Sequence, residues 1–183
     1  YARAVEEFTK ANALNPADPL PDTYISRTYA TVGEFAKAIQ YAQQATKDDP
    51  SDPFLHGNLG TMFYRNRQYQ DAVTSLRLSV SGGTTEEGII VEPLPLDYGR
   101  VAEYYFTYGL TLARQGQCGE ALQISQLLVQ GVPNDETSTY NAQEMVAICQ
   151  EYLVNGTPTP LPTLAEIEVP TPQPTTAPTE GQS

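Results

Sequence analysis

Few side chains in this sequence have the chemistry that a catalytic or metal site needs. The 183 residues include one histidine, two cysteines, two methionines and no tryptophan. His56 has no second histidine, cysteine or carboxylate at ligand spacing, so we interpret it as a helix residue that lies on the surface or is partly buried. A nucleophile with its base would also need more of these residue types. The composition therefore predicts that the protein is not an enzyme and binds no metal and no cofactor.

Three aspartates, Asp48, Asp49 and Asp52, lie around Pro50. A calcium loop needs alternating acids, a glycine and a closing glutamate, and that pattern is missing here. Aspartate also favours turns and helix N-caps, and this is the role we predict for the three residues. None of the motifs GxxxxGK[ST], GxSxG and HExxH occurs, so phosphate transfer, acyl transfer and zinc proteolysis are not indicated.

The charge of the chain narrows its partners. Ten Lys and Arg stand against 22 Asp and Glu, which gives a formal net charge of -12. Nucleic acids and anionic membrane surfaces would repel such a protein. No run of apolar residues approaches the roughly 20 that a membrane span requires. We therefore expect a protein or peptide partner, no nucleic acid and no direct membrane insertion.

The elements that would position any binding residues recur with a period of 34 residues. The recurring columns are Ala4, Ala38 and Ala72; Tyr1, Phe35 and Tyr69; Pro16 and Pro50; and Tyr29 and Phe63. The next unit continues the columns after a shift of 49, which is the period plus an insertion of 15, so that Ala72 maps to Ala121. A period of this length indicates a repeat architecture of stacked helical units.

Apolar residues follow helical spacing within each unit. Between residues 69 and 82, the apolar stripe consists of Tyr69, Ala72, Val73, Leu76 and Val80. Steps of three and four residues place these side chains on one face of an amphipathic helix. The sequence predicts helices at about 1–14, 20–32, 35–48, 54–66, 69–82, 100–115, 118–131 and 136–153.

These residue types and spacings resemble the tetratricopeptide repeat (TPR). One copy is carried by Leu59, Gly60, Phe63, Tyr69 and Ala72; a second by Tyr108, Gly109, Leu112, Gly116, Ala121 and Pro133; and a third, with Ser26 in place of glycine, by Ile25, Tyr29, Gly33, Phe35, Ala38, Ala45 and Pro50. The resemblance implies an all-α fold, a solenoid of antiparallel helix pairs that forms a right-handed superhelix, with an extended C-terminal tail. The implied boundaries are a solenoid at 1–153 (half unit 1–18, units 19–52, 53–86 and 102–135, insertion 87–101, terminal helix 136–153) and a tail at 154–183.

The resemblance also implies a concave groove lined by the first helix of each pair. The positions that line it correspond here to Leu20, Thr23, Arg27, Phe54, Thr61, Tyr64, Arg65, Phe106, Leu110 and Arg114. Arginine and aromatic side chains anchor many protein interfaces. We therefore expect the groove to bind a peptide with an acidic element; in the alternative, these arginines pair with the chain's own carboxylates. The chaperone-type carboxylate clamp of this family uses Lys and Asn where this chain has Thr23 and Arg27, so binding of chaperone tails is not supported.

The insertion interrupts the helical pattern. Residues 82–98 contain two adjacent glycines and two prolines, and their one branched apolar run is Ile89, Ile90 and Val91. Long loops within compact domains are often functional. Two interpretations remain open: a surface excursion whose apolar triplet folds back on the solenoid, or a partner-binding loop.

The two cysteines occupy helix ends that stacked pairs bring to the same side. Cys118 begins the second helix of the last full unit, and Cys149 lies near the end of the following helix. A disulfide between them is one interpretation, and two independent buried thiols are the other. A bond would indicate an oxidising compartment.

The composition changes after residue 153. Residues 154–183 contain seven prolines and seven threonines and no cation, which is typical of extended spacers and of O-glycosylated stalks. Speculative glycosylation sites are Thr157, Thr159, Thr171 and Thr175, and Asn155 opens an N-glycosylation sequon. These features predict an extracellular or cell-surface protein.

Two classes of function follow from the pattern. The first is a non-enzymatic interaction scaffold that binds a peptide or protein partner in its concave groove. The second is a structural subunit: the chain begins with the second half of a repeat and its helical part ends with a first half, so the two ends could stack head to tail into a filament. A regulatory segment of a larger enzyme is a third interpretation.

Overall fold

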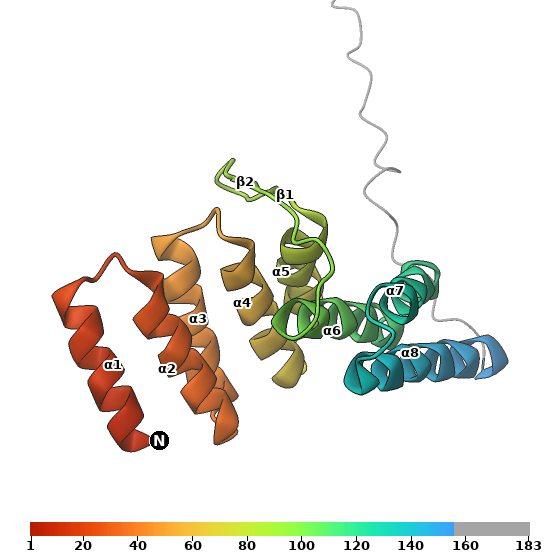
Figure 1. Cartoon of the computed structure of the whole chain (residues 1–183), viewed down its shortest axis with the longest axis horizontal. Helices are drawn as coiled ribbons and strands as arrows, with labels where there is room; N and C mark the ends of the chain where they lie inside the picture. The colour runs from red at the N-terminus through yellow and green to blue at the C-terminus, as the bar shows by residue number, and fades with distance from the viewer. Residues whose placement is uncertain (156–183) are drawn as a thin grey trace, which may run out of the picture.

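The computed structural model describes residues 1–155, which form eight helices and two short strands (Figure 1). The elements are α1 (Ala2–Leu14), α2 (Pro19–Thr31), α3 (Phe35–Asp48), α4 (Pro53–Arg65), α5 (Tyr69–Ser81), β1 (Gly83–Thr84), β2 (Ile90–Val91), α6 (Arg100–Arg114), α7 (Cys118–Gly131) and α8 (Glu136–Asn155). The predicted all-α fold of antiparallel helix pairs is confirmed, and each predicted helix bound lies within two residues of the observed one. Residues 154 and 155, predicted as the start of the tail, belong to α8. The rest of the predicted tail and its speculative glycosylation sites, Thr157, Thr159, Thr171 and Thr175, lie outside the described residues.

Aspartate caps and prolines begin the helices. The Asp18 carboxylate accepts a hydrogen bond from the Leu20 amide at 3.0 Å, and Pro19 is the first residue of α2. Asp52 and Pro53 repeat this arrangement at the start of α4, where the Phe54 amide donates to Asp52 at 2.8 Å. Because the first helical amides have no intrahelical acceptor, a capping carboxylate satisfies one and a first-turn proline removes another. The predicted cap role of Asp52 is confirmed.

A left-handed residue closes the turn within each pair. Gly33 and Gly116 have φ angles of +79° and +75° in the turns between α2 and α3 and between α6 and α7. Arg67 adopts φ of +62° at the equivalent place between α4 and α5. In each turn the next amide donates back to the helix, as Gln68 does to the Phe63 carbonyl at 2.9 Å. This hydrogen bond satisfies a carbonyl that the helix end would leave unpaired.

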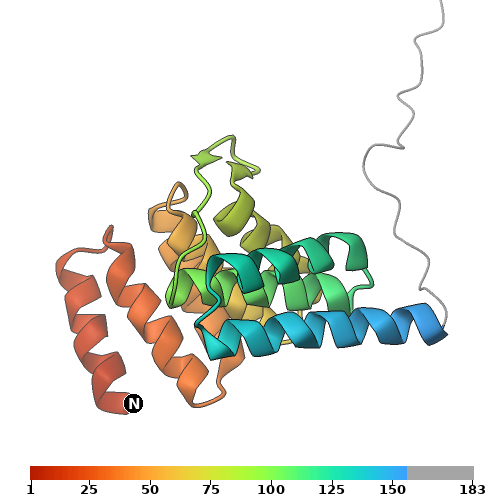
Figure 2. The same cartoon turned by 45° about the vertical axis from the view of Figure 1, so that its right-hand side comes forward.

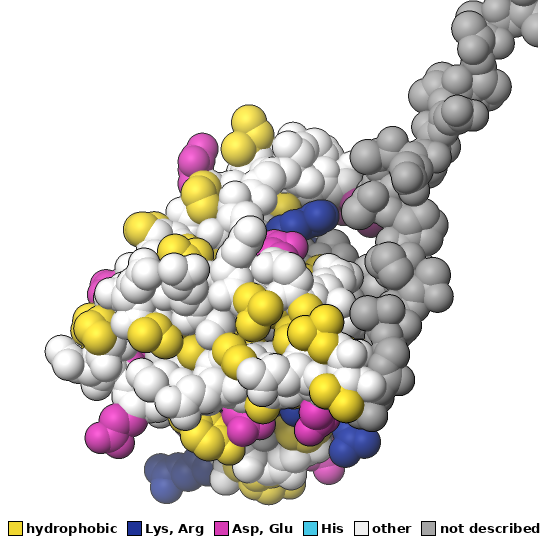
Figure 3. Space-filling model, turned by 90° about the vertical axis from the view of Figure 1, so that its right-hand side faces the viewer, with side chains coloured by type: hydrophobic (Ala, Val, Ile, Leu, Met, Phe, Trp, Pro, Cys, Tyr) yellow, Lys and Arg dark blue, Asp and Glu magenta, His cyan; other side chains and the backbone are white. Residues whose placement is uncertain are grey.

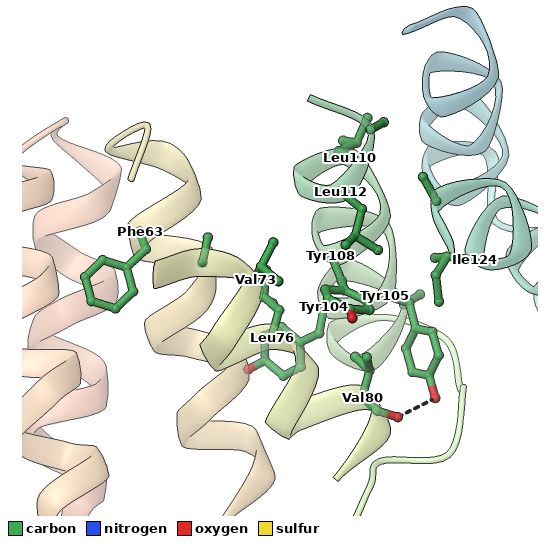
Figure 4. Packing of buried hydrophobic residues seen from close by; sticks show 14 of the residues in the cluster. Phe63, Val73, Leu76, Val80, Tyr104, Tyr105, Tyr108, Leu110, Leu112 and Ile124 are labelled. Atoms are coloured by element: carbon green, nitrogen blue, oxygen red, sulfur yellow. Dashed lines mark hydrogen bonds between the residues drawn. The ribbon is translucent and has the colours of Figure 1, made fainter. Parts of the chain in front are cut away.

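The core lies between neighbouring helices from α2 to α8. Tyr104, Tyr108, Leu76, Leu112 and Leu128 are each less than 2% exposed. Figure 4 shows Tyr104 of α6 pointing toward Leu76 of α5. The Tyr108 hydroxyl donates to Glu120 of α7 at 2.6 Å. Since no single pair can bury its apolar face alone, these contacts between successive pairs supply the core.

The insertion forms a small hairpin, which the sequence analysis did not anticipate. β1 and β2 pair antiparallel, with Gly83 opposite Val91 and Thr84 opposite Ile90. The expectation that the whole apolar triplet folds back is wrong: Val91 is 1% exposed, but Ile90 is 68% exposed. Strand alternation explains the difference, because successive side chains point to opposite faces. Downstream, the Tyr105 hydroxyl donates to the Leu94 carbonyl at 2.7 Å and so ties the loop to α6.

The stack changes direction after the insertion. The helices α1 to α5 stand side by side, whereas α6, α7 and α8 run at a large angle to them (Figures 1 and 2). The predicted disulfide joins Cys118 of α7 to Cys149 of α8, with the two Cα atoms 5.5 Å apart. It fastens the last helix to the preceding pair.

Within residues 1–155, no helix combines the length and hydropathy of a membrane span.

Candidate functional site

Three arginines from separate parts of the sequence meet in one hollow on the first helices of the pairs. The hollow has a volume of about 150 Å³, and its walls come from α2, α4 and α6. Its lining residues are Arg27, Ala30, Thr31, Asn58, Thr61, Met62, Arg65, Arg100, Glu103 and Tyr104. We call this hollow the arginine groove. Only helices that stack in register can bring residues 27, 65 and 100 together, so the repeat architecture creates the site.

Arg27 is held in place by a buried amide. Its Nε donates to the Asn58 side-chain oxygen at 3.2 Å. Asn58 is 2% exposed, and its amide nitrogen lies 3.3 Å from the Ser26 hydroxyl oxygen, to which it donates. The Asn58 amide therefore has a partner for each of its two polar atoms, and the α2 and α4 helices are linked at this point.

Arg65 and Arg100 share a single carboxylate. Arg100 Nη1 lies 2.7 Å from one Glu103 oxygen, and Arg65 Nη2 lies 3.5 Å from the other. The arginine side chains are 43% and 46% exposed, and Glu103 is 21% exposed. The alternative in which groove arginines pair with the chain's own acids thus holds for Arg65. Arg27 instead bonds an amide, so the lining keeps two positive charges in excess of its one carboxylate.

Tyr104 forms part of the wall beneath these arginines. It is 1% exposed, and its hydroxyl donates to the Phe54 carbonyl at 3.2 Å. Burial raises the pKa of Tyr104, and the positive charges of Arg27 and Arg100 partly oppose that rise. The phenol therefore stays protonated and acts as a hydrogen-bond donor that joins α6 to α4.

A second cluster lies at the other end of α6. Arg114 Nε donates to the Tyr64 hydroxyl at 3.3 Å, and the Tyr64 and Tyr69 ring centroids are 5.9 Å apart. This hydrogen bond is the main cause that raises the pKa of Arg114. The Tyr152 hydroxyl of α8 donates to the Arg114 carbonyl at 2.7 Å, which brings the end of α8 beside the end of α6.

The predicted groove residues fall into three groups. Arg27, Thr61 and Arg65 line the arginine groove, while Tyr64 and Arg114 form the cluster just described. Phe54 is 43% exposed, Leu20 is 55% exposed, and Phe106 is partly buried. Three of the predicted groove residues are buried and offer a partner almost no surface: Thr23, Thr61 and Leu110 are 5%, 3% and 6% exposed. The Thr61 hydroxyl donates a hydrogen bond to the Gly57 carbonyl at 2.8 Å and is not free to bind a ligand.

Sequence reasoning missed Asn58, Arg100, Glu103 and Tyr104. The predicted helix at 100–115 contains Arg100, as α6 does, but the unit boundaries assigned this residue to the insertion at 87–101, so it was not counted among the groove positions. The spacing of Arg100 and Glu103, three residues apart at the start of a helix, was the available signal. His56 also differs from the expectation of a surface or partly buried side chain: it is 5% exposed, and its Nε2 lies 2.8 Å from the Pro50 carbonyl oxygen.

A larger cleft lies on the side of the hairpin. It has a volume of about 620 Å³ between α3, α4, α5 and the hairpin turn. Its charged residues are Lys47 and Arg77 on the helices and Glu86 and Glu87 on the turn. These charges balance one another, so the cleft has no preference for one sign. Within the described part of the chain, no group of three or more His, Cys, Asp or Glu side chains could hold a metal ion.

Comparison with known proteins agrees with the helix-pair architecture. No model of a known protein family matches the chain. It is 30% identical over 87 residues to the small glutamine-rich tetratricopeptide repeat-containing protein 2 of Mycosarcoma maydis, which covers 48% of this chain and 25% of that protein. It is 32% identical over 71 residues to the anaphase-promoting complex subunit 6 of Arabidopsis thaliana, or 39% of this chain and 13% of that protein. The chain therefore spans a quarter or less of these relatives.

Two solved structures share the fold. YrrB, described as a TPR protein with an unusual peptide-binding site, superposes with a TM-score of 0.58 at 19% identity, over 81% of this chain and 69% of YrrB. MamA superposes with a TM-score of 0.57 at 15% identity, over 82% of this chain and 81% of MamA.

Proposed function

We propose that this chain is a tetratricopeptide-repeat protein and serves as a non-catalytic interaction module that binds an acidic peptide segment of a partner protein in the arginine groove. Proteins with this repeat generally serve protein–protein interaction. The description of YrrB as a protein with a peptide-binding site supports the same class of ligand for a solenoid of this shape.

The concentration of positive charge carries the proposal. The chain has a formal net charge of -12, yet three of its ten cations line one small hollow that contains a single acid. A local excess of cations attracts acidic segments and repels basic ones.

The geometry suits carboxylates in an extended peptide. A ligand carboxylate that approaches Arg65 and Arg100 meets guanidinium groups that are almost half exposed and that share Glu103 between them. Each guanidinium has five donors, so it can bind a ligand while it keeps a hydrogen bond to Glu103. The Phe54 ring, at 43% exposure, offers apolar area to a neighbouring side chain of the peptide.

Charge reversal in the groove tests this proposal. We expect Arg65→Glu and Arg100→Glu each to weaken the binding of a labelled peptide of alternating glutamate and leucine by about tenfold, measured by fluorescence anisotropy. Raising the salt concentration from 50 to 200 mM should also weaken binding to the unaltered protein, since exposed charges are screened.

The matched control is Arg77→Glu, which makes the same charge change in the hairpin cleft. This variant should bind the peptide nearly as the unaltered protein does. Equal affinities for the unaltered protein and both groove variants would refute the arginine groove as the binding site.

An oxidising compartment is part of the proposal. The disulfide between Cys118 and Cys149 supports it, because such bonds persist in secreted and surface proteins and are rare where thiols are kept reduced. On this basis we propose an extracellular or cell-surface location. The oxidising compartment is tested by recovering the protein from its native source with thiols blocked and measuring the mass of the disulfide-linked Cys118–Cys149 peptide.

End-to-end self-association is a second candidate. Leu122, Leu127 and Val129 of α7 are 40%, 48% and 46% exposed, and Tyr140 of α8 is 62% exposed. Figure 3 shows apolar side chains on this end of the molecule in separate groups among polar atoms. Light scattering at increasing protein concentration distinguishes the candidates. A monomer mass that stays constant rejects self-association. A mass that increases with concentration in the unaltered protein, but not in the Leu127→Glu variant, supports it.

A further inference from the structure

The chain's own tail contains a segment whose chemistry complements the arginine groove. We propose that residues 164–169 bind in the arginine groove of the same molecule and compete with the external ligand. This inference rests on the proposed function, because it assumes that the groove binds acidic peptides. It adds that the unliganded protein is autoinhibited.

The segment differs from the rest of the tail in composition. Residues 154–183 contain no cation, and their three acids are Glu166, Glu168 and Glu180. Glu166 and Glu168 alternate with Ala165, Ile167 and Val169, and Leu164 comes directly before them, whereas Glu180 is flanked by threonine and glycine. Residues 164–169 are therefore the part of the tail that combines two carboxylates with branched apolar side chains.

The groove offers the complementary surface. Arg27, Arg65 and Arg100 line it, and Glu103 is the one acid among its lining residues. The half-exposed Phe54 ring packs edge-on against Tyr104 at the groove wall, with the ring centroids 6.3 Å apart. Two glutamates spaced two residues apart can each meet an arginine, while an apolar residue beside them contacts the ring.

The tail begins close enough to the groove to reach it. The last turns of α8 lie beside the end of α6, since the Tyr152 hydroxyl donates to the Arg114 carbonyl at 2.7 Å. The other end of α6 is Arg100, which lines the groove. A helix of 15 residues is about 22 Å long. Because α8 runs parallel to α6 and continues to Asn155, the start of the tail is about 26 Å from Arg100 along the helix axis. The ten residues 156–165 span about 31 Å when extended, so Glu166 can reach Arg100.

Tethering makes even weak binding effective. A segment on a short linker has an effective concentration on the order of 1 mM at its own site. For an intrinsic dissociation constant of about 0.1 mM, the tail would occupy most grooves and weaken the binding of a competing peptide by roughly tenfold.

The test uses the full chain of 183 residues. A labelled synthetic peptide with the sequence of residues 160–172 serves as the probe, and fluorescence anisotropy gives its dissociation constant. We expect the double variant Glu166→Lys and Glu168→Lys to bind the probe at least tenfold more tightly than the unaltered chain, because its own tail no longer competes. Adding Arg65→Glu to this variant should abolish the gain.

The matched control is Glu86→Lys with Glu87→Lys, which makes the same change in net charge on the exposed hairpin turn. It should bind the probe as the unaltered chain does. If the double variant and the control bind the probe with equally increased affinity, net charge alone is the cause, and this would overturn the inference. A probe that binds the unaltered chain and the double variant equally, or that binds neither, would overturn it as well.

A second probe separates this inference from the proposed function. If the peptide of alternating glutamate and leucine binds the unaltered chain and the double variant with equal, Arg65-dependent affinity, the groove binds acidic peptides but the tail does not compete. If that peptide binds none of the chains, the proposed function itself fails.

Discussion

Asp22 is a carboxylate that the fold buries without a counter-ion in the described part of the chain. It is 1% exposed, and one oxygen accepts a hydrogen bond from the Asn12 amide at 3.0 Å, while the other has no hydrogen-bond partner. Burial raises the pKa of Asp22, the negative charge of Asp48 adds to the rise, and the Asn12 hydrogen bond opposes it. Folding thus shifts the equilibrium of Asp22 toward its neutral form.

This raised pKa gives a signed prediction for stability against pH. Because the folded-state pKa lies above the unfolded value, the stabilising effect of protonated Asp22 is complete below the ordinary aspartate pKa and is lost as the pH rises through the folded value. We expect Asp22→Asn, which cannot ionise, to raise the free energy of unfolding at pH 7 by about 1 kcal/mol. Urea titrations at several pH values give the measurement.

The comparison at low pH provides the control. Well below the ordinary aspartate pKa both side chains are neutral in the folded state, so the stabilities of the variant and the unaltered protein should converge there. A variant that is less stable at pH 7, or a difference that does not change with pH, would contradict the argument.

Single residues were predictable where the chemistry is local. The cap at Asp52 could be derived because an aspartate before a proline satisfies the first amides of a helix wherever it occurs. Arg100 and Glu103 lie in the helix predicted at 100–115, but their contact with Arg65 could not be derived, since it depends on the direction that the insertion gives to α6. Arg67 carries no sequence signal for its left-handed φ, which the equivalent Gly33 and Gly116 reveal only by analogy.

At the scale of elements, the close approach of α4 and α5 depends on a missing side chain. A Cβ atom on Gly60 would lie 2.5 Å from Leu76 Cγ and 2.9 Å from the Leu76 amide nitrogen. Real Cβ atoms do not approach backbone so closely, and Leu76 is fully buried, so the two helices would have to separate.

We therefore expect Gly60→Ala to lower the free energy of unfolding by about 1 to 3 kcal/mol, measured by chemical denaturation. Gly119→Ala is the matched control, because a Cβ at this exposed position in α7 meets nothing within 4 Å. The control should be neutral or stabilise by up to about 1 kcal/mol through helix propensity. Similar effects for the two substitutions would show that helix contact at Gly60 is not the cause.

The helices could be predicted from the sequence because the same apolar spacing of three and four residues recurs in each 34-residue unit. The hairpin could not, since strands of two residues carry too little pattern to be recognised. The burial of Val91 and the exposure of Ile90 depend on a register that forms only when the loop packs against α5 and α6.

At the scale of the whole molecule, the repeat predicts that neighbouring pairs stack but not that the stack turns after α5. The arginine groove lies at this turn, where α4 meets α6. The position of the groove therefore depends on the insertion as well as on the repeat. For this reason the repeat positions predicted Arg27 and Arg65 as groove residues but not Arg100 and Glu103.

The two ends of the stack differ in how firmly they are held. No residue of α1 is fully buried, and its contacts with α2 include the stacked rings of Phe8 and Tyr24 at 5.0 Å. At the other end, Met145 is 0% exposed, Cys149 is 1% exposed, and the disulfide fixes α8 to α7. Because each pair in such a stack is stabilised mainly by its neighbours, opening should begin at the less firmly held end.

Amide hydrogen exchange measured by mass spectrometry tests this asymmetry. We expect α1 to exchange first and α8 to be protected nearly as well as α6 while the disulfide is intact. Reduction frees a loop of 31 residues, which should lower stability by about 3 to 4 kcal/mol and speed exchange in α8 by at least tenfold. Exchange in α1 should stay unchanged, because it opens without involving the bond. Equal protection at both ends before reduction, or an α8 that does not respond to reductant, would contradict the prediction and show that opening involves the stack as one cooperative unit.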